Sequence, residues 1–123
     1  MQIQINTGNG LENKETLERW AEAEIKGSLA RFAEDVTRVE VHLSDEASGK
    51  ESGNDKRCTM EARLSHHKPV AVTHDAPTLD EAFRGAEGKL KRLLEHTLAK
   101  LDHKRDRESI RKDSGLVPEE PAA

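Results

Sequence analysis

The sequence predicts a two-layer α+β domain in which a four-stranded sheet carries two helices on one of its faces. Three observations support this fold class. Four short segments alternate apolar and polar residues, two longer segments repeat apolar residues at helical spacing, and the order is β-α-β-β-β-α. Each helix has a single apolar face, so both helices must pack on one side of the sheet and leave its other side exposed.

The first strand and the first helix occupy the amino-terminal part of the chain. Residues 1–6 alternate, with Ile3 and Ile5 on one face, and a glycine-containing turn follows at 7–10. Asn13 is the expected N-cap of the helix. The apolar face of this helix consists of Leu17, Trp20, Ala21, Ile25, Leu29 and Phe32.

Three consecutive strands should then form an antiparallel meander, while the first strand joins the sheet through the helix. The strands are expected at residues 36–44, 57–65 and 70–74. A long polar loop at 45–56 and a tight turn "HHKP" at 66–69 connect them. The middle strand should bury Cys58, Met60, Ala62 and Leu64.

The last helix opens with a capping box, in which Thr78 is the N-cap and Glu81 follows three residues later. Apolar residues then recur at helical spacing from Leu79 to Leu101. We expect the folded domain to span residues 1–105 and residues 106–123 to form a flexible charged tail.

Composition excludes several classes of function. The aromatic residues are Trp20, Phe32 and Phe83, too few for a platform that stacks single-stranded bases. Cys58 is the single cysteine, so no internal disulfide can form, and alternation places it inward as a buried structural thiol. No apolar run approaches the roughly 20 residues of a membrane span, and residues 1–10 do not resemble an export signal. A cytoplasmic protein with no membrane partner is expected.

Positive charge is concentrated in the last helix, although the chain has a formal net charge of -4. Residues 84–112 contain ten Lys/Arg and five Asp/Glu, whereas residues 1–83 contain ten Lys/Arg and sixteen Asp/Glu. One row along the helix is free of acids for about 27 Å. We call this row the basic stripe; it consists of Lys89, Arg92, His96, Lys100, His103 and Arg107. The acids Glu87, Glu95, Asp102 and Asp106 should lie elsewhere around the helix, mostly toward its far side, among Arg84 and Lys91.

Two interpretations of the basic stripe follow from the residues alone. Its length suits several phosphates of a polyanion, each neutralised by one cation. Alternatively, the cations form a solvated face that complements the helix dipole. A helix charged only for solubility usually mixes signs at i,i+4, and the absence of acids from the stripe favours the polyanion.

The sequence resembles the ribosome hibernation-promoting factor family, also called ribosome-associated inhibitor A or sigma-54 modulation proteins. The resemblance rests on the β-α-β-β-β-α order, on "VTHDAPTLDEAF" entering the last helix, on "KLKRLLEH" within it and on "DHKR" at its end. The resemblance covers about residues 1–105. The family form that the sequence resembles is the short form, which lacks a separate dimerisation domain.

The resemblance implies a fold similar to the double-stranded-RNA-binding domain and a function on the ribosome. Family members occupy the channel of the small ribosomal subunit that messenger and transfer RNA use, chiefly through ribosomal RNA phosphates, under stress or in stationary phase. Lys89, Arg92, His96 and Lys100 align with basic positions of the family's last helix. The first helix departs from the family, since Glu18, Glu24 and Gly27 replace expected cations and only Arg19, Lys26 and Arg31 remain.

These observations predict a ribosome hibernation factor that inhibits translation by occupying that channel. Its partners would be the 16S-type RNA and proteins of the small subunit, and it would be monomeric away from the ribosome. The predicted RNA contacts are Lys89, Arg92, His96, Lys100, His103, Lys104 and Arg107, with Arg111 and Lys112 as a looser extension.

Two other functions remain open on the sequence. The exposed sheet face could dock a protein through Arg38, Glu40, His42, Thr59, Glu61 and Arg63, or the domain could bind duplex RNA away from the ribosome. Enzymatic activity is not expected, because no acid is placed in an apolar setting that would raise its pKa and no base pairs with Cys58 in the sequence. No cofactor, small-molecule substrate or metal is predicted: His66 and His67 lack a nearby thiol or carboxylate, and His42 and His74 are interpreted as surface residues.

Overall fold

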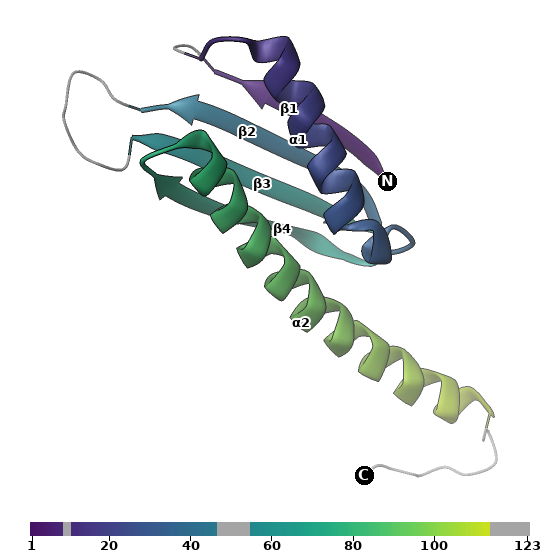
Figure 1. Cartoon of the computed structure of the whole chain (residues 1–123). Helices are drawn as coiled ribbons and strands as arrows, with labels where there is room; N and C mark the ends of the chain where they lie inside the picture. The colour runs from purple at the N-terminus through teal and green to yellow at the C-terminus, as the bar shows by residue number, and fades with distance from the viewer. Residues whose placement is uncertain (9–10, 47–54, 114–123) are drawn as a thin grey trace.

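The computed structural model describes residues 1–8, 11–46 and 55–113, with side chains described as far as Leu101 in the last helix. Its elements follow the predicted order (Figure 1), which confirms the α+β fold class. They are β1 (Gln2–Thr7), α1 (Lys14–Ser28), the 3-10 helix η1 (Ala30–Phe32), β2 (Val36–Asp45), β3 (Lys56–Leu64), β4 (His67–Ala76) and α2 (Leu79–Asp113).

The strands form one sheet in the order β1-β2-β3-β4. β1 is parallel to β2, as a connection through α1 requires, and the other two pairs are antiparallel, so the predicted meander is confirmed. Ile3 lies beside Val39 and Ile5 beside Val41. Because neighbours in register point to the same face, the apolar residues of the strands coincide on one side of the sheet.

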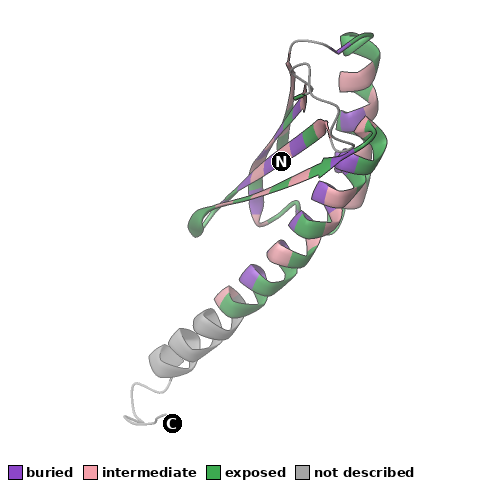
Figure 2. Ribbon diagram, turned by 90° about the vertical axis from the view of Figure 1, so that its left-hand side faces the viewer, coloured by how far each residue is buried: buried purple, intermediate pink, exposed green. Residues whose placement is uncertain are grey.

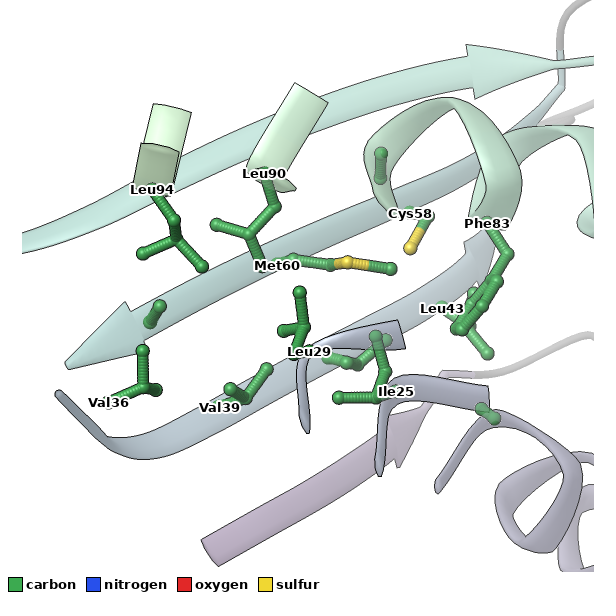
Figure 3. Close-up of a cluster of buried hydrophobic side chains, with 14 of the residues drawn as sticks. Ile25, Leu29, Val36, Val39, Leu43, Cys58, Met60, Phe83, Leu90 and Leu94 are labelled. Atoms are coloured by element: carbon green, nitrogen blue, oxygen red, sulfur yellow. The ribbon is translucent and has the colours of Figure 1, made fainter. Parts of the chain in front are cut away.

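Both helices cover that apolar side (Figure 1), and Figure 2 shows the helix layer and the sheet edge on. One buried cluster joins the two layers. It includes Leu29 after α1, Leu90 of α2 and Met60 of β3, all fully buried (Figure 3). A fully buried side chain of this size stabilises the fold by about 1.5–3 kcal/mol, so the cluster holds α2 firmly on the sheet.

The ends of α1 differ from the sequence prediction in detail. Asn13 precedes the helix as expected, and its carbonyl accepts the Leu17 N–H at 2.9 Å, but its side chain makes no capping bond. Its φ of 53° is left-handed, a conformation that asparagine tolerates better than most residues. The helix ends at Ser28, and Phe32 reaches the core from η1 rather than from a continued helix.

The predicted turn at 66–69 is wrong. β3 ends at Leu64 and β4 begins at His67, so the turn consists of Ser65 and His66. Pro69 therefore lies inside β4. A proline is tolerated there because β4 is an edge strand, and the missing N–H costs no ladder bond when it faces outward.

Helix α2 begins as predicted and runs far beyond the sheet. The Glu81 N–H donates to Thr78 Oγ1 at 3.1 Å, which confirms the N-cap. The helix is unbroken for 35 residues, about 52 Å at 1.5 Å per residue (Figure 1). It continues past residue 105, where the sequence analysis ends the domain. Residues 114–123 lie outside the described residues, and the division into domain and tail stays a prediction.

Glu87 is not on the far side of α2, where the sequence analysis placed most acids of this helix. It is buried, with 8% exposure, because it follows Phe83 by four residues and precedes Leu90 by three, on the core face. Its Oε1 lies 3.9 Å from Arg84, and its Oε2 has no hydrogen-bond partner among the described residues. The sequence analysis did not place an acid on this buried face of α2.

Cys58 is buried in β3, as predicted. Burial, together with the negative charge of Glu87, raises the pKa of its thiol to about 12. A thiol that keeps its proton is a poor nucleophile, which agrees with a structural role.

We expect Cys58 to titrate only at very alkaline pH in the folded chain. Its ordinary pKa is 9.0 and its folded pKa is about 12, so the folded state binds the proton more tightly. Its contribution to stability is complete below pH 9.0 and is lost as the pH rises to about 12, at up to about 1.4 kcal/mol per pH unit. Urea unfolding of the wild type and of Cys58→Ala from pH 8 to pH 11 measures this.

The Cys58→Ala variant should lose less stability than the wild type over the same pH range, because it lacks the thiol. The lysines and arginines are common to both proteins, so their titration cancels in the comparison. An equal loss in the two proteins would contradict the assigned environment. Native Cys58 should also react with a disulfide reagent only after urea is added.

Candidate nucleic-acid interface

The basic stripe is exposed along the part of α2 whose side chains are described. Lys89, Arg92, His96 and Lys100 are all exposed, at spacings of three and four residues. Because α2 is continuous, these four form a straight row of about 16 Å. The side chains of His103, Lys104 and Arg107 lie outside the described residues, and their place in the row stays a prediction.

The side of α2 that faces α1 carries ion pairs between the helices. Arg84 Nη1 lies 2.8 Å from Glu24 Oε1, and Arg31 of η1 pairs with Glu95. Glu95 is the one acid of α2 between Lys89 and Lys100. Since it is held by Arg31, the described part of the stripe, from Lys89 to Lys100, has no helix carboxylate within it.

The stripe borders β4 at its amino-terminal end. Lys89 Nζ donates a hydrogen bond to the Thr73 carbonyl oxygen at 2.9 Å. Asp75 lies on β4 two residues after Thr73. The hydrogen bond from Arg57 of β3 holds the pKa of Asp75 below its ordinary value, and the charges of His74 and Lys89 also lower this pKa. The stripe therefore has an acid close to it in space, although none lies in it along the helix.

His74 has a closer relation to the stripe than the sequence analysis assigned. A Cβ at Gly85 would lie 2.1 Å from the His74 ring, so the imidazole fills the space where residue 85 would carry a side chain. Gly85 precedes Lys89 by one helical turn. The partly exposed His74 thus continues the line of the stripe from α2 onto β4. The sequence signal for this contact was Gly85, a glycine four residues before Lys89, the first residue of the stripe.

Helix α1 adds few available cations. Arg19 pairs with Glu15 at 2.5 Å, Arg31 pairs with Glu95, and Lys26 is exposed. Among the acids that replace the family's expected cations, Glu24 pairs with Arg84 and Glu18 accepts a hydrogen bond from Thr7 at 3.0 Å. Glu18 and Glu24, which depart from the expected cations, therefore both contact other elements of the fold.

The exposed face of the sheet is polar, and its charges contact one another. Glu40 lies 2.9 Å from Arg38, 3.6 Å from His42 and 3.9 Å from Arg63. At the β3–β4 side, Arg57 binds both oxygens of Asp75, at 2.9 and 3.3 Å. Because these charges neutralise each other within the face, it lacks the single-sign field of the stripe.

The described residues give no support to other kinds of site. They contain no group of three or more His, Cys, Asp or Glu side chains placed to hold a metal. His66 and His67 are exposed at the β3–β4 turn, and His67 Nδ1 contacts the Lys68 carbonyl at 2.8 Å. None of the helices in the described ranges is long and apolar enough to cross a membrane.

The described residues thus form a two-layer domain with a row of exposed cations along one helix. Solved structures share its fold. It is similar to the Protein Y N-terminal domain of Thermus thermophilus, with 21% identity and a TM-score of 0.62 over 79% of this chain and 99% of that one. It is also similar to a ribosomal subunit interface protein of Coxiella burnetii, with 16% identity and a TM-score of 0.59 over 80% and 99% of the two chains.

The chain belongs to the sigma 54 modulation protein / S30EA ribosomal protein family, whose model matches residues 3–102. This confirms the resemblance seen in the sequence. No curated protein matches the chain. At identities of 21% and 16%, the two solved structures establish the fold and leave the residues of the interface to be tested.

The close approach of Gly85 to His74 can be tested with two glycine variants of α2. Gly88→Ala should stabilise the protein by about 1 kcal/mol, because its Cβ meets only Arg92 Nη1 at 3.6 Å and alanine favours the helix. Gly85→Ala gains the same propensity but must displace His74, so it should destabilise the fold by about 1–3 kcal/mol. Chemical denaturation measures both.

A double variant separates the clash from other effects. Gly85→Ala with His74→Ala should recover most of the lost stability, which gives a coupling free energy between the two positions. If Gly85→Ala is as stabilising as Gly88→Ala, His74 does not occupy the space above Gly85.

Proposed function

We propose that this chain binds the small ribosomal subunit and inhibits translation by occupying the channel for messenger and transfer RNA under stress or in stationary phase. Membership of the S30EA family over residues 3–102 supports a ribosomal role. The observation that carries the proposal is an exposed row of basic residues on one unbroken helix of a member of this family. The row consists of Lys89, Arg92, His96 and Lys100. His103, Lys104 and Arg107 extend the proposed contact.

Phosphate groups are the ligands that this row would recognise. Lysine and arginine neutralise phosphates and release condensed counterions, so each contact strengthens binding and makes it sensitive to salt. Contacts of this kind fix position without reading sequence. The buried cluster beneath α2 keeps the row straight, so little backbone order would have to be gained on binding.

The charge distribution suggests one docking orientation. The helix α1 side is rich in carboxylates, and Arg19 and Arg31 are engaged with Glu15 and Glu95. An RNA surface would therefore meet α2 and the adjoining β4 edge first, with α1 turned away. His74, beside Gly85, joins the proposed contact residues in this orientation.

Reversing the charge of two stripe residues should release the protein from ribosomes. We expect Arg92→Glu with Lys100→Glu to weaken binding at least tenfold and to reduce the slope of log affinity against log salt by about two, since two phosphate contacts are lost. Sedimentation with purified small subunits at several salt concentrations measures both quantities.

A matched control carries the same change in net charge at another exposed place. Lys14→Glu with Arg19→Glu alters the first turns of α1, where both side chains are exposed. It should bind within a few-fold of wild type. An equal loss in the two double variants would assign binding to net charge rather than to the stripe. Strong binding to isolated duplex RNA would instead support action away from the ribosome.

The proposed stress role makes a separate prediction. In gradients of lysates, the protein should sediment with small subunits or whole ribosomes from starved cells and should be scarce in the ribosomal fractions of growing cells. Arg92→Glu with Lys100→Glu should stay at the top of the gradient in both conditions. Wild-type protein that never enters the ribosomal fractions would overturn the proposed function.

A further inference from the structure

Strand β4 is an edge strand with a sequence suited to further pairing. In the sheet of the described residues, β3 is its one neighbour. Residues 70–73 read Val-Ala-Val-Thr, an uncharged run with high strand propensity. Edges of this kind readily pair with another strand, and proteins usually protect them with prolines or charges.

The Lys89 hydrogen bond shows which backbone groups of β4 face outward. In an antiparallel ladder, residues alternate between those that exchange both backbone bonds with the neighbour and those that exchange none. The Thr73 carbonyl is turned to Lys89, and the Thr73 and Thr59 hydroxyls lie 3.1 Å apart, as closely spaced non-bonded pairs allow. By the same alternation, Ala71 also faces outward. The regular ladder ends at Val70, because the register of β3 and β4 shifts between Ala62 and Leu64.

One of these two outward positions is already blocked, and the strand cannot be extended before them. Pro69 has no N–H to offer a new strand. The Thr73 carbonyl accepts the Lys89 ammonium at 2.9 Å, and the exposed lysine stem lies over the edge. Ala71, between them, keeps an open N–H and C=O. A new strand would need Thr73 as well as Ala71 to form a ladder of useful length.

We propose that Lys89 closes the β4 edge against antiparallel pairing with β4 of a second copy of this chain. A second copy fits because antiparallel self-pairing superposes the two uncharged runs. It also brings Lys68, before the run, toward Asp75, after it, in the partner. Lys89 then has a role in the free protein that does not depend on RNA. This role is independent of the proposed binding to the ribosome.

Removing the ammonium tests this inference. In sedimentation velocity over a wide range of protein concentration, Lys89→Ala should dimerise at least tenfold more tightly than wild type. Arg92→Ala is the matched control, since it removes one cation from the same stripe one turn away from the edge contact. It should sediment as wild type does, and Lys89→Arg, which keeps a donor, should also remain monomeric.

Two further measurements place the contact. In the Lys89→Ala dimer, hydrogen exchange of the Ala71 and Thr73 amides should slow, because they enter a new ladder. Adding Ala71→Pro should restore the monomer by removing the central N–H. Identical sedimentation of Lys89→Ala and Arg92→Ala overturns the proposal. So does a dimer in which the Ala71 and Thr73 amides exchange as fast as in wild type, a readout that holds even if the proline variant fails to fold.

Discussion

The packing of α2 on the sheet is the contact on which the other features depend. Phe83, Ala86, Leu90 and Leu94 are fully buried along one face of this helix, against a sheet that offers Cys58 and Met60. Each large buried side chain contributes about 1.5–3 kcal/mol. Because this contact fixes the rotation of α2 about its axis, it also decides which residues face water, α1 and β4.

Charge is distributed around α2 according to that rotation. Toward α1, carboxylates and guanidinium groups bridge the helices, as in Arg84 with Glu24 and Arg31 with Glu95. Toward solvent and β4, the described part of the stripe from Lys89 to Lys100 presents cations without helix carboxylates among them. An acidic chain can thus expose a local field of positive sign, and such fields raise the association rate of a polyanion.

β4 links the sheet to the basic stripe. It holds His74 under Gly85, and its Thr73 carbonyl accepts Lys89. The lysine is therefore both the first residue of the stripe and a cover for the sheet edge. Substitutions of Lys89 would change two properties at once, whereas Arg92 and Lys100 report on the stripe without this complication.

Local patterns in the sequence determined the elements, their order and the exposed stripe. Strand alternation, helical spacing and the Thr78 cap act over a few residues, so they can be recognised without the fold. The same helical spacing could have predicted the burial of Glu87, since this residue lies in line with Phe83 and Leu90. The extent of β4 through Pro69 was not, because it depends on β4 being at the sheet edge.

Only the tertiary structure decided which distant residues meet the stripe. Asp75 and His74 come from β4, and Arg31 reaches Glu95 across 64 positions of the chain. These contacts arise because burial of the helix faces brings remote segments within a few ångströms, and no local pattern encodes that distance.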